Sequence, residues 1–181
     1  MPGGGKSTVG RHLARRLGID FVDTDTAIEH RIGQPIRAFF EQSGEERFRD
    51  IESEVLTDLL TSTNGVIATG GGIVLRAINR DLLQRQTTCI YLRSTPDELF
   101  RRLRHDTRRP LLQVADPLAR LRQLYAERDA LYREAAHFVI ETGRPSVPTL
   151  VNMILMQLEL AGVIDPGAAA SPIDATPRGG D

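Results

Sequence analysis

The chain begins with a glycine-rich run that ends in a lysine and two hydroxyl residues, Gly3-Gly4-Gly5-Lys6-Ser7-Thr8. These residues fill most of the phosphate-binding pattern in which a glycine is followed by four residues and then by Gly-Lys-Ser/Thr. Because glycine has no Cβ, the backbone N–H groups of such a run can curl round a phosphate. We expect Lys6 to reach the outer phosphates of a nucleotide and Ser7 to hold Mg²⁺ through its hydroxyl.

A glycine run also occurs in flexible loops, so the residues that follow it decide between the two interpretations. Val9, Leu13 and Leu17 share one face of a predicted helix, and Gly18 is placed to end that helix. A helix that starts directly after the glycines directs its positive N-terminal end at a bound anion. The pattern therefore favours a phosphate site over a flexible loop.

Two carboxylates one residue apart, Asp23 and Asp25, follow a short apolar segment at 19–23 that we predict to be a strand. One carboxylate can orient a metal ion and its waters, and the other can bind a substrate hydroxyl. The alternative is a pair of capping residues for a helix that begins near Ala27. The nearby phosphate loop favours the chemical role.

Arginines are the third group of residues with chemical potential. Arg49 lies three positions before Glu52 on a predicted helix, so the carboxylate can steer the guanidinium. Five arginines lie within the segment 101–110, and Arg128 follows on a later helix. Phosphoryl transfer builds negative charge on phosphate oxygens, which an arginine can cover. Solvated surface is the alternative interpretation for each arginine.

The elements that must position these residues alternate between helix and strand. Strands are predicted at 19–23, 66–69, 88–92 and 137–141, and helices at 9–17, 27–60 with a break at Gly44, 76–84, 96–104, 118–135 and 147–160. This alternation predicts an α/β fold with a parallel sheet covered on both faces. Ligands of such sheets bind beyond the carboxyl ends of the strands, where Asp23, Asp25 and the run Gly70-Gly71-Gly72 are expected.

Composition narrows the class of protein. The 181 residues fit one domain at 1–164, followed by a tail at 165–181 whose Pro, Gly, Ala and Ser content predicts disorder. A formal net charge of −1 argues against a nucleic-acid or membrane surface as partner. The single cysteine, Cys89, excludes an internal disulfide and is expected to be a buried strand thiol. We expect a cytoplasmic protein.

Taken together, the motifs resemble those of the shikimate kinase family. They are Gly-Gly-Gly-Lys-Ser-Thr, Asp-Thr-Asp, Phe-Arg-x-Ile-Glu, Gly-Gly-Gly, Arg-Pro-Leu-Leu and Arg-x-x-Leu-Tyr, and the resemblance runs from the first residues to about Ala161. It implies a P-loop kinase with three layers, a central parallel sheet and a closing lid at about 105–117, like the nucleoside monophosphate kinases. It also implies transfer of the γ-phosphoryl group of ATP to the 3-hydroxyl of shikimate, on the pathway to chorismate and aromatic amino acids.

The resemblance implies a role for each matching residue on the nucleotide side. Gly3, Gly4, Gly5, Lys6, Ser7 and Thr8 would bind ATP, with Ser7 and Asp23 near Mg²⁺. Arg109 would be a lid arginine that meets the phosphates during catalysis, and Arg102 would lie beside the adenine. The family position after the last strand often carries a polar or basic side chain. Here Pro145 occupies it, and Arg144 is expected to substitute.

On the acceptor side, the resemblance implies that Asp25 binds the shikimate hydroxyls and accepts the 3-hydroxyl proton. Arg49 and Arg128 would grip the carboxylate, which suits the planar fork of a guanidinium. Gly71 and Gly72 would bind the substrate through backbone N–H groups. We expect a monomer that binds ATP and shikimate.

The resemblance is incomplete at the start of the chain. The family has an apolar first strand just before the phosphate loop, and neither that strand nor the first loop glycine is in this sequence. We expect the native enzyme to carry about ten further residues upstream, from the length of a strand plus the missing glycine.

Three other functions remain open at this point. Gluconate kinase has a related architecture and a carboxylated substrate, although Asp-Thr-Asp and the two arginines favour shikimate. A nucleotide kinase would need a pocket for a base, and the chain has few aromatic residues to stack one. A non-catalytic nucleotide-binding module would keep Lys6 and Ser7 but would not need Asp25, Arg49 and Arg128.

Overall fold

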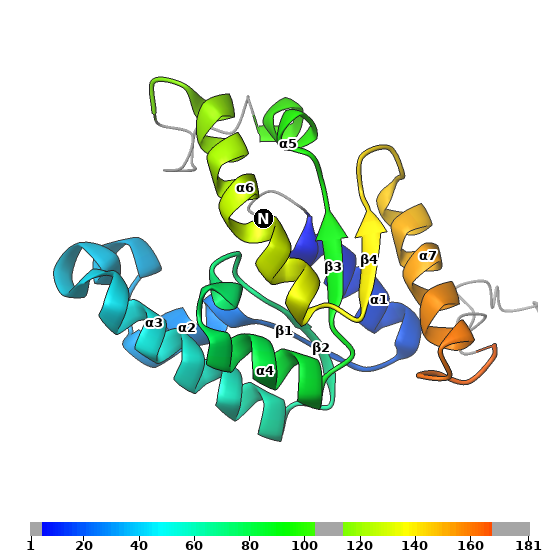
Figure 1. Ribbon diagram of the computed structural model, residues 1–181. Coiled ribbons are helices and arrows are strands. Elements are labelled where there is room, and N and C mark those ends of the chain that lie inside the picture. Colours follow the sequence, from blue (N-terminus) through cyan, green and yellow to red (C-terminus); the bar gives the residue numbers. More distant parts are fainter. Residues whose placement is uncertain (1–4, 104–113, 168–181) are drawn as a thin grey trace, which may run out of the picture.

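The computed structural model describes residues 5–103 and 114–167. Helices and strands alternate along the chain as the sequence predicts (Figure 1). The elements are α1 (Lys6–Leu17), β1 (Asp20–Asp23), α2 (Thr24–Ile32), α3 (Ile36–Ser62), β2 (Gly65–Ala68), the 3₁₀ turn η1 (Ile73–Leu75), α4 (Ala77–Gln86), β3 (Ile90–Arg93), α5 (Pro96–Leu103), α6 (Pro117–Ala135), β4 (Phe138–Glu141) and α7 (Val147–Leu160).

The four strands pair in parallel, which confirms the predicted α/β class. β1 pairs with β2 from Asp20–Gly65 to Asp23–Ala68, and β3 pairs with β4 from Ile90–Phe138 to Arg93–Glu141. Within the described residues these pairs form two separate sheets rather than one continuous sheet.

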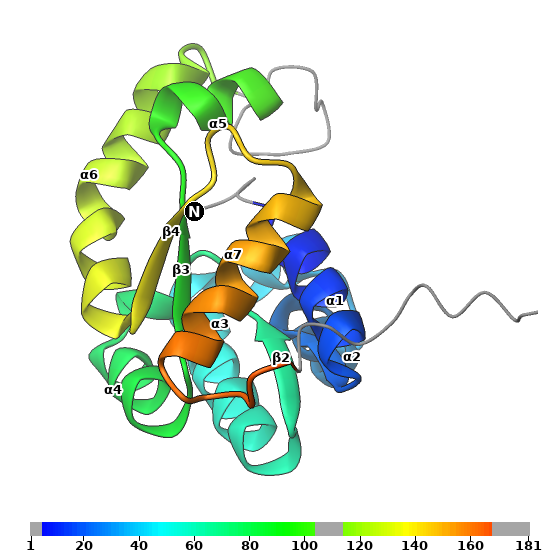
Figure 2. The ribbon, with the colours of Figure 1, turned by 90° about the vertical axis from the view of Figure 1, so that its right-hand side faces the viewer.

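Helices cover the strands on two sides, which gives the expected three layers. In Figure 2, α6 lies on one side of β3 and β4, and α1 and α7 lie on the other. The α1–α7 layer packs Val9 and Leu13 against Ile154, while the α6 side packs Leu121 and Tyr132 around Tyr91. A third apolar cluster joins α2 to α3 through Ile28, which is fully buried.

Local signals account for several boundaries. Gly18 ends α1 in the left-handed conformation at φ 67°, and Gly44 kinks α3 at φ 78°, both at predicted positions. Pro117 occupies the first turn of α6 behind a capping Asp116. The strands differ from prediction by one or two residues, because hydrogen-bond pairing rather than apolar content sets where a strand begins.

Cys89 corrects one expectation. It precedes β3 instead of lying within it, and it is half-buried rather than fully buried. Burial raises the pKa of its thiol to about 11, so the thiol stays protonated at neutral pH. His137 helps to hold this segment, since its Nδ1 accepts a hydrogen bond from the backbone N–H of Cys89 at 3.0 Å.

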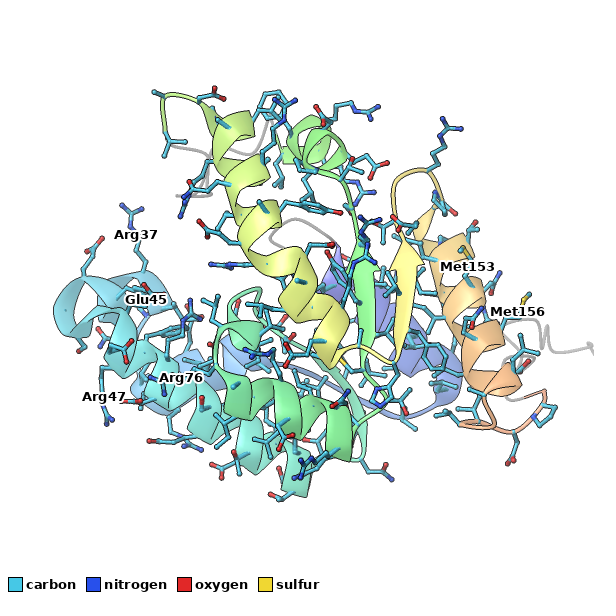
Figure 3. The ribbon with its side chains drawn as sticks, viewed as in Figure 1. Arg37, Glu45, Arg47, Arg76, Met153 and Met156 are labelled. Atoms are coloured by element: carbon cyan, nitrogen blue, oxygen red, sulfur yellow. The ribbon has the colours of Figure 1, made fainter. Side chains whose placement is uncertain are left out.

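Two groups of labelled side chains lie at opposite sides of the molecule in Figure 3. Arg37, Glu45 and Arg47 project from the first part of α3, whereas Met153 and Met156 lie on the outward face of α7 at the opposite side (Figure 3). In the part of the chain that the structure describes, no helix is both long and apolar enough to span a bilayer.

Candidate active site

The phosphate loop leads directly into α1. Gly5 caps the helix with φ 74° and ψ 18°, a left-handed conformation that favours glycine, and its carbonyl accepts from Val9 N–H at 2.9 Å. Lys6, Ser7 and Thr8 form the first turn of the helix. Their N–H groups therefore belong to the positive end of the helix dipole, which suits a phosphate group. Gly3 and Gly4 lie outside the described residues.

Ser7 and Asp23 meet at the end of β1, although they are sixteen positions apart in sequence. Ser7 Oγ donates to Asp23 Oδ2 at 2.5 Å, and Asp23 Oδ1 accepts from the backbone N–H of Asp25 at 2.9 Å. Asp23 is thus the N-cap of α2, as the alternative interpretation predicted, while its second oxygen faces the phosphate loop. The capping role and the chemical role are compatible, because Oδ1 caps α2 while Oδ2 binds Ser7 beside the phosphate loop.

This hydroxyl–carboxylate pair fits a magnesium ion. Mg²⁺ takes oxygen ligands and usually keeps waters and substrate phosphates, with only one or two protein groups. Among the described residues there is no cluster of three or more His, Cys, Asp or Glu side chains that could form a complete metal cage. Ser7 and Asp23 beside a phosphate loop match an ion that arrives with a nucleotide.

Asp25 lies on the first turn of α2 and has charged neighbours of both signs. It keeps access to solvent, yet the surrounding protein partly desolvates it and raises its pKa, and the negative charge of Asp23 acts in the same direction. Lys6 and Arg49 oppose the rise in pKa. Lys6 on α1 and Arg49 on α3 therefore lie within electrostatic reach of the same carboxylate.

The Gly70–Gly72 segment packs against Asp25 and Arg49. A Cβ on Gly70 would lie 2.8 Å from Asp25 Oδ1, and a Cβ on Gly72 would lie 2.2 Å from Arg49 Nη1. The backbone N–H of Gly70 donates to Thr24 Oγ1 at 3.0 Å. An alanine at either position would displace the Asp25 or Arg49 side chain, because these side chains of α2 and α3 occupy the space of a Cβ.

Arg49 is held in place from several directions. Its Nη1 donates to Glu52 Oε1 at 2.7 Å, so the predicted pairing of these residues is present. Glu52 is 2% exposed, and burial raises its pKa while the charge of Arg49 counteracts that rise. The guanidinium also lies 5.1 Å from the centre of the Phe48 ring. The Arg49 guanidinium is therefore oriented before any ligand binds.

Arg128 approaches the same region from α6. Its charge acts on the hydroxyl of Tyr132, one turn later on the helix, and on Glu52. The Nε atoms of Arg49 and Arg128 are both buried without a hydrogen-bond partner among the described residues. Two guanidinium groups, each with an unused Nε–H donor, are suited to an anionic ligand.

The structure thus gathers Lys6, Asp25, Arg49, Gly71, Gly72 and Arg128 from five separate parts of the chain. A cavity of about 50 Å³ reaches Lys6, Gly70 and Gly71, but most of its lining is apolar core around Tyr91, and Asp25, Arg49 and Arg128 do not line it. A cationic loop, an acid and two guanidinium groups in this arrangement can hold a phosphate donor against a small carboxylated acceptor.

The residues expected beside the adenine lie at the carboxyl ends of β3 and β4. Arg102 Nη2 donates to the carbonyl of Thr142, and Arg102 Nη1 donates to Ser94 Oγ at 3.4 Å. These bonds tie the end of α5 to the loop after β4. Arg144 in that loop is exposed, and Pro145 is half-buried. Arg109 and most of the lid predicted at about 105–117 lie outside the described residues, which leave out 104–113.

Sequence reasoning gave no role to Thr24, Gly70 or Tyr132, all of which contact the cluster. Gly70 stood within the glycine run, and Tyr132 stood in the Arg-x-x-Leu-Tyr motif, so both had a visible signal. Thr24 is 1% exposed, and an isolated threonine carries no signal in sequence for a bond across the fold. Only tertiary packing brings its hydroxyl to the Gly70 backbone.

Comparisons with known proteins agree with this geometry. The family model described as "Shikimate kinase" matches residues 2–159. The shikimate kinase of Paracidovorax citrulli is 58% identical over 170 residues, covering 92% of each chain, and that of Burkholderia lata is 57% identical, covering 97% of this chain and 92% of the relative.

Solved structures agree as well. A shikimate kinase from Acinetobacter baumannii in complex with shikimate has a TM-score of 0.82 and 43% identity, with 90% of each chain covered. One from Aquifex aeolicus has a TM-score of 0.77 and 34% identity. The P-loop kinase fold, the match along the chain and the convergence of acid and arginines lead to one conclusion: this chain belongs to the shikimate kinase family.

Proposed function

We propose that the kinase domain, residues 1–164, transfers the γ-phosphoryl group of ATP to the 3-hydroxyl of shikimate at the cluster around Asp25. One observation supports this most strongly. Asp25 lies within electrostatic reach of Lys6 in the phosphate loop and of Arg49, whose guanidinium packs on Gly72. The acid is therefore placed between the side that receives ATP and the side that receives a carboxylate.

On the ATP side of the site, the residues would act mainly by balancing the negative charge of the phosphates. The backbone of Gly3, Gly4 and Gly5 and the start of α1 would surround the phosphates, with Lys6 on the outer ones and Thr8 in the same turn. Enzymes of this family are ATP-dependent and generally need a divalent metal, here Mg²⁺ near Ser7 and Asp23. When bound, the ion would offset the negative charge of the phosphates. Arg109 would add a further positive charge from the lid.

On the acceptor side, Asp25 would take the proton of the 3-hydroxyl. As that oxygen forms its bond to the γ-phosphorus, the bond from phosphorus to the β–γ bridging oxygen breaks, and ADP leaves with its electron pair. A carboxylate with a raised pKa is a stronger base than an ordinary aspartate, which suits this transfer. Arg49 and Arg128 would bind the carboxylate of the substrate, and the N–H groups of Gly71 and Gly72 would bind its ring substituents.

Two further arginines are proposed to contact the nucleotide. Arg102 is anchored to Thr142 beside the loop that carries Arg144, so these two arginines would flank the adenine. We further propose a cytoplasmic monomer that has ATP and shikimate as ligands and that binds neither nucleic acid nor membrane.

A coupled ADP-release assay with shikimate and gluconate tests the substrate. Shikimate-dependent turnover at least a hundredfold above that with gluconate is expected, and the reverse preference would overturn the assignment.

The Asp25→Asn variant tests the base. It should lose about 10²–10⁴ in turnover with ATP affinity unchanged, because general-base catalysis has that magnitude. Asp20→Asn, an exposed aspartate at the start of β1, is the matched control and should be fully active. Normal turnover in Asp25→Asn would remove Asp25 from the catalytic role.

A further inference from the structure

Tyr132 on α6 has no role in the mechanism above, yet it lies within reach of two of the groups proposed to bind the acceptor. Its hydroxyl donates to the carbonyl oxygen of Gly71 at 2.6 Å. The charge of Arg128, one turn earlier on the helix, acts on the same hydroxyl. A phenol oxygen can donate one bond and accept another, so this atom can serve the guanidinium as well as the glycine segment.

The ring of Tyr132 is fixed independently of these bonds. It is 7% exposed, and it stacks on Tyr91 with ring centroids 4.9 Å apart and an interplanar angle of 30°. The hydroxyl of Tyr91 in turn donates to Asp129 Oδ1 at 3.0 Å. Packing against β3 therefore determines where the Tyr132 hydroxyl lies, and the polar groups of the site adjust to it.

The bond to Gly71 has a consequence for the next residue. The carbonyl of Gly71 and the N–H of Gly72 belong to one planar peptide unit and point in opposite directions. Because Tyr132 holds the carbonyl oxygen, it also sets the direction of the Gly72 N–H. Glycines have few conformational restraints of their own, so this segment depends on such an external bond.

We propose that Tyr132 is a positioning residue for the phosphoryl acceptor, one that orients the Arg128 guanidinium and the Gly72 N–H together through its hydroxyl. This inference rests on the proposed function, because it concerns the groups that would bind shikimate. Burial raises the pKa of Tyr132, so its hydroxyl remains a donor over the working pH range. The residue itself need not touch the substrate.

The test replaces the hydroxyl and keeps the ring. In Tyr132→Phe the stacking on Tyr91 is retained, while the hydroxyl beside Arg128 and the Gly71 carbonyl is lost. We expect the KM for shikimate, and its Kd by titration calorimetry, to rise about tenfold, with kcat and the KM for ATP within twofold of the parent. That rise corresponds to about one hydrogen bond, since 1.4 kcal/mol is a factor of ten.

Tyr125→Phe is the matched control. Tyr125 lies on the same helix and its hydroxyl bonds with Arg93, so this variant loses a comparable bond away from Gly71 and Arg128. It should leave the shikimate KM unchanged. In an Arg128→Ala background, Tyr132→Phe should raise the KM for shikimate by a smaller factor than it does in the parent chain, because the arginine that the hydroxyl orients is already absent.

The outcomes are distinct. A shikimate KM within twofold of the parent in Tyr132→Phe would overturn the inference. Equal rises in the KM for shikimate and the KM for ATP, together with a lower Tm, would also overturn it, because a merely structural residue affects both substrates in that way. If the parent chain itself neither binds nor phosphorylates shikimate, the proposed function fails first, and the inference fails with it.

Discussion

Gly72 offers a sharp test of how the acceptor site is built. Its backbone has φ −87° and ψ −1°, a conformation that alanine adopts without strain. A Cβ there would nevertheless lie 2.2 Å from Arg49 Nη1 and 2.5 Å from both Arg49 Cζ and Arg49 Nη2. Gly72→Ala therefore probes a single contact, the one between the glycine and the guanidinium.

The size of the effect follows from the displacement. Non-bonded heavy atoms prefer separations of about 3.5–4.0 Å, so the guanidinium must move by roughly 1 Å or more. That movement strains its 2.7 Å bond to Glu52 and misaligns it with a substrate carboxylate. Loss of one charge-assisted hydrogen bond is worth about 1.5–3 kcal/mol, which corresponds to a rise of about 10–150-fold in the KM for shikimate.

Steady-state kinetics with each substrate varied in turn measures this effect, and the KM for ATP should stay within twofold. Gly162→Ala is the matched control. Gly162 has φ 69° with open space around its Cβ position, so alanine there strains the backbone by about 1 kcal/mol without touching the site. That variant should lower Tm and leave both KM values unchanged.

A double-mutant cycle with Arg49→Ala completes the test. If Gly72→Ala acts by displacing Arg49, it should add little once the guanidinium has been removed. An effect of equal size in the Arg49→Ala background, or a shikimate KM within twofold of the parent in the single variant, would refute the reasoning.

Two further predictions concern Asp25 and Ser7. Desolvation and the charge of Asp23 raise the pKa of Asp25 in the folded protein above its ordinary value of 3.8. Protonated Asp25 therefore contributes to the free energy of unfolding fully below pH 3.8, and this contribution is lost as the pH rises through the folded-state pKa. Asp25→Asn should therefore raise Tm at pH 7 by an amount that shrinks as the pH falls towards 3.8 in thermal-denaturation scans, and a lower Tm at pH 7 would contradict this. Ser7→Ala removes the hydroxyl that donates to Asp23, so the Mg²⁺ concentration for half-maximal activity should rise about 10–100-fold. Ser7→Thr retains a hydroxyl and should leave that concentration unchanged. Equal Mg²⁺ requirements in the parent and both variants would remove Ser7 from the metal site.

Local signals in the sequence were sufficient for much of the fold. Val9, Leu13 and Gly18 predicted α1 and its end, and the Gly44 break in the long α3 helix was also predicted. These features depend on residues that are close together in the sequence, so the sequence is enough to predict them. The exact strand limits, such as the start of β1 at Asp20, were not, because hydrogen bonds to a distant strand define them.

The sequence by itself determined which chemical groups are present and near which strand end each one lies, since motif spacing and the alternation of helix and strand are properties of the chain. Tertiary structure alone decided that the Arg49 guanidinium lies beside Gly72, that Asp23 binds Ser7 with the oxygen that does not cap α2, and that the Tyr132 hydroxyl donates to the Gly71 carbonyl. These contacts join residues that the chain separates by between sixteen and sixty-one positions, and packing around the strands selects them.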